Sequence, residues 1–479
     1  MPSAESDTVS LPGSATRAQR GVSPGLTITA LATGFVMAQL DVTVVNVAGA
    51  AIQADLRASL TELTWIVDGY VLIFGSLLML AGGLANRIGA KTIYLWGMVI
   101  FFVASLGCAL APNAALLVVA RLVQGAGAAL FMPSSLSLLV FAFPDKRQRT
   151  RMLGLWSAIV ATSAGLGPTV GGLLVSAFGW QSIFLLNLPI GITGMVMTRR
   201  YIAPSEGRTI KLAVPGHVVW IVALAALSFA LIEGPRLGWG TGPVLISYAV
   251  LVIAAGLLVV RERSADNLVM PWNLFHRPGF AGANTVGFLF NFAFYGSMFM
   301  LSLYFQHARG ASPLQAGLML LPMTFSIPLA NIVYSRISGR FSNSTLLTTF
   351  MLTAGIASLV MITISSSTPY WVVALVVGIS TLGAGIISPG MTAAMVDAAG
   401  AENANVAGSV LNANRQIGTL VGIAAMSVVL GTISDWNRGP AVSFLFIGIA
   451  YLVGGVSAWL LITRSERLEA AVAGATARA

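Results

Sequence analysis

The sequence predicts an all-α integral membrane protein with fourteen transmembrane helices, arranged as two six-helix bundles with two further helices inserted between them. Its 479 residues are 56% hydrophobic and only 9% charged, whereas soluble globular proteins carry about a quarter charged residues. Fourteen apolar segments are long enough to cross a bilayer, whose core of about 30 Å requires roughly 20 helical residues. Lys and Arg are concentrated in alternate loops, as the positive-inside rule requires.

The fourteen segments follow one another along the chain with short connections, and the sixth is among the shortest. They span residues 26–52, 62–84, 92–111, 113–142, 152–177, 181–198, 213–233, 242–260, 279–305, 314–335, 345–364, 370–396, 403–432 and 442–463. The residues before the first segment lack an apolar core, so we expect a disordered tail there and no cleaved signal peptide.

The basic residues predict the orientation of the chain. If both termini are cytoplasmic, twenty of the 26 Lys and Arg residues fall in cytoplasmic segments, two lie within helices, and only four lie in outer segments. Those four are Arg57, Arg236, Arg309 and Arg438. Because one missed helix would invert every later loop, this distribution supports an even number of helices with both ends inside.

Two similar loops indicate that the chain contains two related halves. NRIGAK (86–91) follows the second segment and SRISGR (335–340) follows the tenth. If the ninth segment restarts the pattern of the first, the seventh and eighth are insertions, and repeated halves around a midplane site are typical of secondary transporters. The expected organisation is a cytoplasmic tail at 1–25, a six-helix bundle at 26–200, two linker helices at 201–265, a second six-helix bundle at 266–463 and a cytoplasmic tail at 464–479.

Several other kinds of site are not expected. Cys108 is the single cysteine and the three His residues are far apart, so the sequence offers no disulfide and no metal site. It contains no phosphate loop or catalytic cluster, so we expect neither a cofactor nor an enzyme. The net charge of +10 follows from the cytoplasmic loops and does not indicate nucleic acid. A large bundle buries its own polar residues, so a monomer is expected.

Four ionisable residues are expected within the membrane, namely Asp41, Asp68, Arg121 and Arg415. Each costs about 2.5–3.5 kcal/mol on insertion scales, which makes each a candidate functional residue. At about 1.5 Å per residue, the first three fall within one slab roughly 8 Å deep in the outer half of the membrane. Asp41 is the first candidate for binding a proton or a cation, and Arg121 would compete with that proton.

Alternatives remain open for each of these charges. Asp41 can be a buried structural partner of Arg121 or of a backbone group, and Arg121 can extend toward the outer interface. Asp68 lies near a helix end and can be merely hydrated. Arg415 lies near the middle of its helix, where it can contact the substrate or make structural hydrogen bonds.

Helix geometry separates two polar faces of the first segment. Gln39, Thr43 and Asn46 form one stripe, and Asp41 points nearly the opposite way. We assign the cavity to Asp41, because burying its charge costs more, and expect the other stripe to bond to neighbouring helices. Gln124 follows Arg121 by three residues and is expected to support the same polar site.

The ninth segment carries a candidate substrate face. Asn291, Phe294, Tyr295 and Met298 follow the spacing i, i+3, i+4 and i+7, which places them on one side of a helix. Packing against lipid is the alternative for the apolar members, but the two polar side chains favour a cavity for hydrophobic ligands.

Other segments carry weaker signals. The stretch AGLGPTVGG (164–172) surrounds a proline with glycines inside the fifth segment, which predicts a hinge or a close packing seam. Its members are Gly165, Gly167, Pro168, Gly171 and Gly172. Glu233 and Asp397 lie at helix ends and are expected to be solvated.

Five motifs together resemble the fourteen-helix drug:proton antiporter branch of the major facilitator superfamily. The resemblance covers all fourteen segments. It is carried by LDVTVVNVA (40–48), GGLANRIGAK (82–91), RLVQGAGAA (121–129), GLGPTVGG (165–172) and LNANRQIGTLVG (411–422).

The resemblance implies a major-facilitator-type fold and proton-coupled multidrug efflux from a bacterial cytoplasmic membrane by alternating access. The implied partners are protons, the lipid bilayer and small lipophilic substrates, which are expected to be cationic. The alternative is a dedicated exporter of one natural product, siderophore or metabolite. The resemblance also associates the Arg of the fourth segment, here Arg121, with proton transfer.

The loop motif departs from the branch at one position. Its residues here are Gly83, Asn86, Arg87, Gly89 and Lys91. Asn86 occupies the position that usually carries an acid, whose charged contacts are thought to hold the cytoplasmic side shut. An amide can hydrogen-bond but carries no charge, so we expect the outward-facing state to be less favoured here than in relatives.

Overall fold

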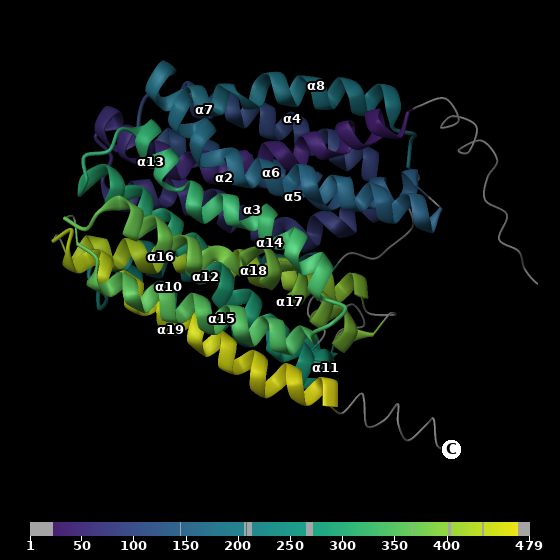
Figure 1. Ribbon diagram of the computed structural model, residues 1–479. Coiled ribbons are helices and arrows are strands. Elements are labelled where there is room, and N and C mark those ends of the chain that lie inside the picture. Colours follow the sequence, from purple (N-terminus) through teal and green to yellow (C-terminus); the bar gives the residue numbers. More distant parts are fainter. Residues whose placement is uncertain are drawn as a thin grey trace, which may run out of the picture.

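The computed structural model is built from helices in the part of the chain that it describes (Figure 1). The described residues are 23–143, 145–205, 207, 213–264, 272–365, 367–400, 404–433 and 435–467. Most of the two expected tails therefore lies outside the described residues.

The helices fall into a first group, an inserted pair and a last group. The first group comprises α2 (Pro24–Leu56), α3 (Leu60–Ile88), α4 (Ala90–Ala109), α5 (Ala114–Ala142), α6 (Lys146–Phe178), α7 (Ser182–Leu185) and α8 (Asn187–Tyr201). The inserted pair is α9 (Val214–Leu237) and α10 (Gly242–Ser264). The last group comprises α11 (Trp272–Phe275), α12 (Pro278–His307), α13 (Pro313–Met319), α14 (Leu321–Ile337), α15 (Asn343–Val360), η1 (Met361–Thr363), α16 (Tyr370–Leu382), α17 (Ala384–Ala399), α18 (Ala404–Thr432), α19 (Arg438–Ser457) and η3 (Ala458–Ile462).

Every predicted segment coincides with a helical segment. Thirteen segments of the described chain are long and apolar enough to cross a membrane, and α6, with 33 residues, covers the remaining predicted segment at 152–177. Three predicted segments are divided, at Leu186, Leu320 and Gly383. At the second of these breaks, α14 begins with a proline in its first turn, where the missing backbone N–H costs no helical hydrogen bond.

Local sequence signals set the points where helices begin. The Ser59 hydroxyl accepts from the Glu62 backbone N–H, and the Glu62 carboxylate accepts from the Ser59 backbone N–H, which is a capping box at the start of α3. Ser312 and Gln315 make the same exchange at the start of α13. Arg57, with φ 52°, adopts the left-handed conformation that ends α2.

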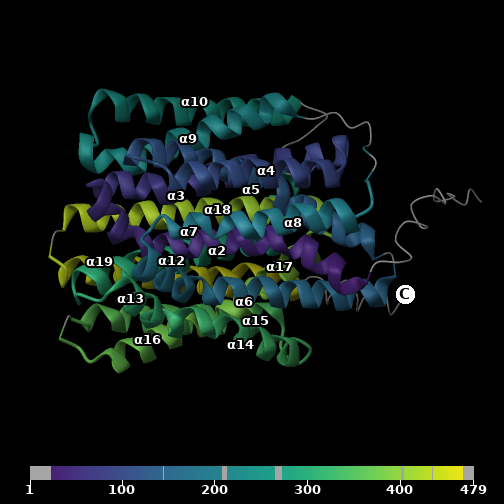
Figure 2. The ribbon, with the colours of Figure 1, turned by 90° about the horizontal axis from the view of Figure 1, so that it is seen from above.

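The helices run nearly parallel and form two halves (Figure 2). The first group, α2–α8, makes one half, and the last group, α11–η3, makes the other. The inserted pair lies along one flank, where α9 packs against α3 and α18. Helix α2 begins and η3 ends at the same end of the bundle (Figure 1), which we call the termini end, and the opposite end is the distal end.

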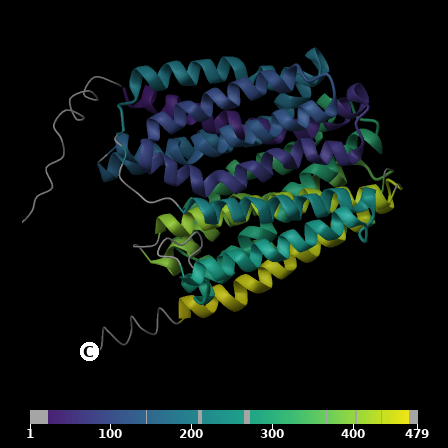
Figure 3. The same ribbon diagram turned by 180° about the vertical axis from the view of Figure 1, so that it is seen from behind.

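The two halves meet at the distal end. Four hydrogen bonds between described residues join them there: Ser302 Oγ to Asn46 O at 2.7 Å, Gln306 Nε2 to Val47 O at 3.1 Å, Thr64 Oγ1 with Ser427 Oγ at 2.5 Å, and Leu314 N to Ser176 Oγ at 3.1 Å. Toward the termini end the ribbons of the halves diverge (Figure 3). The structure is thus closed at its distal end.

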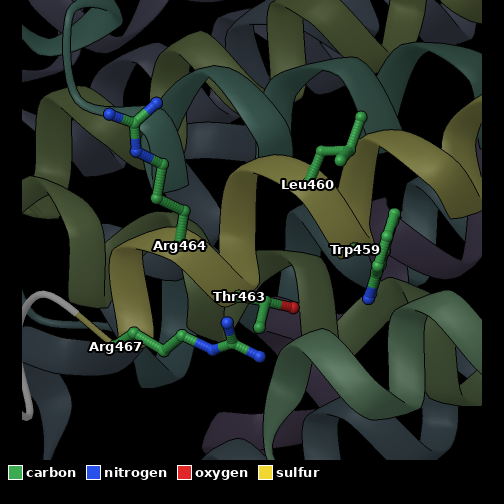
Figure 4. Close-up of a pocket in the computed structure, with 5 residues that line it drawn as sticks. All are labelled: Trp459, Leu460, Thr463, Arg464 and Arg467. Carbon is green, nitrogen blue, oxygen red and sulfur yellow. The ribbon is translucent and has the colours of Figure 1, made fainter.

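A surface pocket of about 300 Å³ lies beside η3 at the termini end (Figure 4). It is lined by Trp459, Leu460, Thr463, Arg464 and Arg467. An aromatic ring beside exposed arginines is typical of a membrane–water interface. The pocket lies at the surface and away from the buried charges of the bundle.

The alternation of helices yields a test of topology. Gly240, in the α9–α10 connection at the distal end, and Gly339, after α14 at the termini end, both have open space where a Cβ would lie. Since Cys108 is fully buried, single Gly240→Cys and Gly339→Cys variants should label without background. A membrane-impermeant maleimide should label only Gly240→Cys in intact cells, and Gly339→Cys should react after permeabilisation. Labelling of Gly339→Cys in intact cells would refute cytoplasmic termini.

Candidate functional site

The central feature of the first half is an ion pair between Asp41 of α2 and Arg121 of α5. The Arg121 guanidinium donates to Asp41 Oδ2, and each residue is only 1% exposed. Close approach of α5 to its neighbours depends on small residues, since a Cβ on Gly127 would lie 2.6 Å from the backbone N of Phe101 in α4. The run of small residues after Arg121 therefore lets the charge reach the bundle interior.

Neutral amides complete the surroundings of the Asp41 carboxylate. Gln124 Nε2 donates to Asp41 Oδ1 at 2.8 Å and to Ser105 Oγ at 2.9 Å. Asn187 Nδ2, at the first residue of α8, donates to the same Asp41 oxygen at 3.1 Å. The carboxylate thus receives hydrogen bonds from α5 and α8 in addition to its ion pair.

The Arg121 side chain is equally well surrounded. Its Nε donates to Ile66 O of α3 at 2.9 Å, and its Nη1 donates to Gln124 Oε1 at 2.7 Å. The guanidinium carbon lies 4.4 Å from the centre of the Tyr70 ring, close enough for a cation–π contact. We call Asp41, Ser105, Arg121, Gln124 and Asn187 the polar cluster.

The polar cluster changes one expectation about α2. The Asp41 face was expected to line a cavity, but Asp41 points into the interior of its own half and is almost fully buried. Asp41, Arg121 and Gln124, which the sequence assigned to one polar site, contact one another in the structure. Asn187 and Ser105 were not predicted. Each is a polar residue in an otherwise apolar segment, and sequence alone does not show which helix such a residue faces.

Asp68 lies apart from the polar cluster, at the junction of the halves. On α3, Thr64 one turn away bonds to Ser427 of α18, and a Cβ on Gly75 two turns the other way would lie 2.7 Å from Gln416 Cβ of α18. Asp68 shares this face of α3. It is fully buried, and neither carboxylate oxygen has a hydrogen-bond partner among the described residues. The predicted common site therefore includes Asp41 and Arg121 but not Asp68.

Arg415 of α18 lies in the interior of the bundle without a charged partner. Its side chain is half-buried. A Cβ on Gly287 of α12 would lie 3.8 Å from Arg415 Cγ, and Tyr295 of the same helix lies within electrostatic range. Among the described residues, the Arg415 side chain makes no hydrogen bond and no ion pair, although its backbone carbonyl accepts from Thr419 Oγ1 at 3.1 Å. The neighbouring Asn414, in contrast, donates to Asn284 O of α12 at 2.5 Å.

The residues of the predicted face of α12 differ in burial. Phe294 and Met298 belong to the hydrophobic core, and Asn291 is buried with its Nδ2 bonded to Gly287 O at 2.7 Å. Tyr295 is half-buried, and its ring lies edge-on to Phe294 at 5.3 Å. Of the four residues, only Tyr295 has substantial accessible surface.

The glycine-rich motif of α6 is a packing seam between two helices. On one side, a Cβ on Gly171 would lie 2.9 Å from Val44 Cβ of α2, and one on Gly167 would overlap Thr43. On the other side, Gly172 would meet Pro313 O at 2.5 Å and Gly165 would meet Thr324 O at 3.3 Å. Pro168 O lies against Gly317. The motif thus holds α6 against α2 and against α13–α14 of the other half.

The loop motif packs on its own half. Lys91 Nζ donates to Ile202 O at 2.5 Å, and the Lys91 backbone N–H donates to Ser205 Oγ at 2.8 Å. Gly89, with φ 110°, has no room for a Cβ against Ser205 O. Gly83 is half-buried, and Asn86 and Arg87 are exposed.

The two helix-end acids differ. Asp397 is exposed, as expected. Glu233, expected to be solvated, is only 9% exposed. It accepts from Trp65 Nε1 of α3 at 2.9 Å and from Arg236 Nε at 2.7 Å. The expectation was wrong because α3 lies against this end of α9, and the acid thereby ties the inserted pair to the first half.

Two packed helical halves, closed at one end and carrying buried charges at mid-helix, define a polytopic membrane transporter. No group of three His, Cys, Asp or Glu residues within the described ranges is placed to hold a metal ion. The sequence model of the Major Facilitator Superfamily matches residues 31–423. The chain belongs to that superfamily.

Two known relatives and one solved structure are similar to this chain. The chain is 75% identical to a methylenomycin A resistance protein of Streptomyces coelicolor, over 95% of this chain and 96% of the relative. It is 34% identical to the multidrug resistance protein Stp of Mycobacterium tuberculosis, over 85% and 75%. A crystal structure of a peptide transporter POT in complex with sulfate shares the fold, with a TM-score of 0.72 and 18% identity over 94% of this chain and 97% of the other.

The polar cluster leads to a prediction about stability. Arg121→Gln leaves the Asp41 charge buried without its cation, and Asp41→Asn leaves Arg121 unpaired, so each should lower the unfolding free energy by about 3–5 kcal/mol. The double variant removes both charges and should cost less than the sum of the single variants. Thermal unfolding of the four purified proteins measures this coupling. Additive losses would show that the ion pair contributes little.

The α6 seam leads to a prediction about conformation. Gly172→Val places a side chain against the Pro313 backbone, so it should separate the halves at the distal end. Spin labels at Ala54→Cys and Thr363→Cys, near the distal ends of α2 and η1, report that separation by pulsed electron resonance. Gly82→Val, at a glycine with open space around it, is the matched control and should leave the distance distribution unchanged. An unchanged distribution in Gly172→Val would contradict the assignment of the seam.

Proposed function

We propose that the protein exports an antibiotic natural product in exchange for protons, by alternating access. In this proposal it lies in the bacterial cytoplasmic membrane as a monomer, with both termini in the cytoplasm, so the distal end faces outward. The structure then corresponds to an inward-facing state, in which the two bundles have closed against each other on the outer side.

The observation that carries the coupling proposal is the contrast between the two buried acids. Asp41 is matched by a cation and by two amide donors, which suits an ionised carboxylate. Asp68 is fully buried without any donor among the described residues. An ionised carboxylate in such surroundings is costly, so the neutral, protonated acid fits this state.

The position of Asp68 links its proton to the conformation. It lies between the Thr64–Ser427 bond and the Gly75–Gln416 contact, where α3 and α18 must part when the outer side opens. Water then reaches the carboxylate and removes the cost of ionisation. When Asp68 takes up a proton from the outer side, closure of that side becomes favourable. Protons can then move inward through the cycle, as proton-driven export requires.

Asp41, Arg121 and Asp68 form the proposed coupling set. The sequence favours Asp41 as the proton carrier. Asp68 is the second candidate, because neither of its carboxylate oxygens has a hydrogen-bond partner among the described residues. In the second assignment, Arg121 and Gln124 hold Asp41 as the rigid centre of the first bundle. Release of a proton from the polar cluster would require movement of Arg121, whose Nη1 donates to Asp41 and Gln124 and whose Nε donates to Ile66 O.

The remaining predicted residues receive roles in the gating cycle. The glycines of α6 form the outer seam, and the loop at 83–91 forms the cytoplasmic gate. In the present state Asn86 and Arg87 are exposed, which agrees with a gate that is not engaged. Tyr295 and Arg415 face the substrate path, and Asn291, Phe294 and Met298 pack behind them.

The substrate proposal rests on the relatives. The highly similar Streptomyces protein is named for methylenomycin A resistance, which favours a dedicated antibiotic as substrate. A relative named for multidrug resistance supports a second candidate, broad export of lipophilic cations. Methylenomycin A and a lipophilic cationic dye are therefore the first compounds to compare.

Inverted membrane vesicles test coupling and substrate together. With an imposed proton gradient, methylenomycin A should cause proton release in wild type, read with a pH-sensitive dye. Asp68→Asn should reduce the initial rate at least about tenfold, because an amide cannot exchange a proton. Asp435→Asn, at an acid on the distal surface, is the matched control and should retain the wild-type rate.

Other outcomes redirect the proposal. Loss of the signal in a folded Asp41→Asn, with normal Asp68→Asn, would make Asp41 the proton carrier. A response to the cationic dye alone would favour broad cation export. Methylenomycin A export that proceeds equally without a proton gradient would refute coupling.

A further inference from the structure

Arg415 bears a positive charge that no described group neutralises. Arg121, the other arginine in the middle of a helix, is paired with Asp41 and bonded to Gln124 and Ile66. Arg415 makes no comparable contact. An unpaired guanidinium within the membrane region is costly, and such a residue is retained when something else supplies its partner.

The position of Arg415 shows where that partner would come from. Its neighbour Gln416 makes the close contact with Gly75 of α3, since a Cβ on that glycine would lie 2.7 Å from Gln416 Cβ. Asn412, one turn closer to the termini end and on the same face as Gln416, is exposed. Arg415 therefore lies next to the contact between the halves, on the side toward the termini end, where Asn412 is exposed.

Tyr295 adds a neutral donor beside this charge. It lies on α12 within electrostatic range of Arg415, is half-buried, and its hydroxyl makes no hydrogen bond to any described residue. Helices α12 and α18 pack closely beside it, because a Cβ on Gly287 of α12 would lie 3.8 Å from Arg415 Cγ and one on Gly296 would lie 3.1 Å from Gly422 O. The Arg415 guanidinium and the Tyr295 phenol are thus both partly accessible, and neither makes a hydrogen bond to a described residue.

We infer that Arg415 and Tyr295 form the recognition site for a carboxylate, or an oxyanion of similar size, on the exported compound. A guanidinium presents two parallel N–H donors that match the two oxygens of a carboxylate, and the phenol supplies a further O–H. The inference rests on the proposed export function, whose substrate class it narrows to small lipophilic acids.

The neighbouring acids do not fulfil this role. Asp41 is held inside the first half by Arg121, Gln124 and Asn187. Asp68 lies two turns away from Gly75 on the distal side, about 10 Å along the helix axis, beyond the contact that closes the interface. A cationic substrate near Arg415 would meet repulsion, whereas an anionic one would remove the cost of the buried charge.

Binding of three matched probes tests the inference on the full-length protein in phosphatidylcholine nanodiscs. Naphthalene-1-carboxylate, naphthalene-1-carboxamide and naphthalen-1-ylmethylammonium share one ring system and differ in charge. Wild type should bind the carboxylate most tightly. Arg415→Gln should weaken carboxylate binding about tenfold to a hundredfold, the usual range for a lost hydrogen bond to a charged group. It should leave carboxamide binding nearly unchanged.

Two further variants sharpen the test. Arg415→Lys keeps the charge but not the paired donors, so it should retain intermediate affinity. Arg464→Gln, at an exposed arginine of the surface pocket (Figure 4), controls for general charge effects and should bind like wild type. Equal affinity of wild type for all three probes, or unchanged carboxylate binding in Arg415→Gln, would overturn the inference.

Stability provides an independent readout. Because Arg415 has no partner in the described structure, Arg415→Gln should not lower the unfolding temperature, and a clear decrease would instead indicate a structural role and overturn the inference. The outcome for transport is separable. Arg415-dependent carboxylate binding, without proton release by wild type for any compound in vesicles, would support this site and refute the proposed function.

Discussion

The ion pair of Asp41 and Arg121 is the contact on which the first half of the molecule depends. In a region without bulk water, neither charge is tolerated alone, and their mutual attraction offsets desolvation only when the remaining donors and acceptors are also satisfied. Gln124, Asn187, Ser105 and the Ile66 carbonyl supply those partners. Because they come from α3, α4, α5 and α8, satisfying one pair of charges fixes five helices relative to one another.

The contacts between the halves have a different character. They consist of neutral hydrogen bonds near the distal end and of glycines, from the distal end to the middle of the helices, that allow close approach. The seam of α6 against α13–α14 and the contact of Gly75 with Gln416 illustrate this. Such surfaces can separate without exposing an unpaired charge to lipid. The first half is therefore held together by buried polar bonds, and the halves are joined by contacts that can be exchanged, which is the mechanical requirement for alternating access.

Charge is distributed unequally among these parts. Among the described residues, the first half contains a neutralised pair, Asp68 at the junction accepts no hydrogen bond, and the Arg415 side chain in the second half has no ion-pair partner. Since uncompensated groups within the membrane region are costly, their locations indicate where exchangeable partners act. In the proposed cycle, a proton acts at Asp68 in the closing interface, and an acidic group of the substrate acts at Arg415.

The sequence by itself determined the helical membrane fold, the number of segments and the candidate charged residues. Segment length, apolar content and the positions of the basic residues are local properties, so they can be determined from the sequence without knowledge of how the helices pack. The sequence also predicted that Asp41, Asp68 and Arg121 lie at similar depth in the membrane. Only the tertiary structure decided that Asp41 faces Arg121 and Asn187 inside one bundle, that Asp68 faces α18, and that Tyr295 is accessible while Phe294 and Met298 are core. Helical periodicity fixes the angle between residues on one helix, but the rotation of that helix against its neighbours is set by packing between segments far apart in the chain.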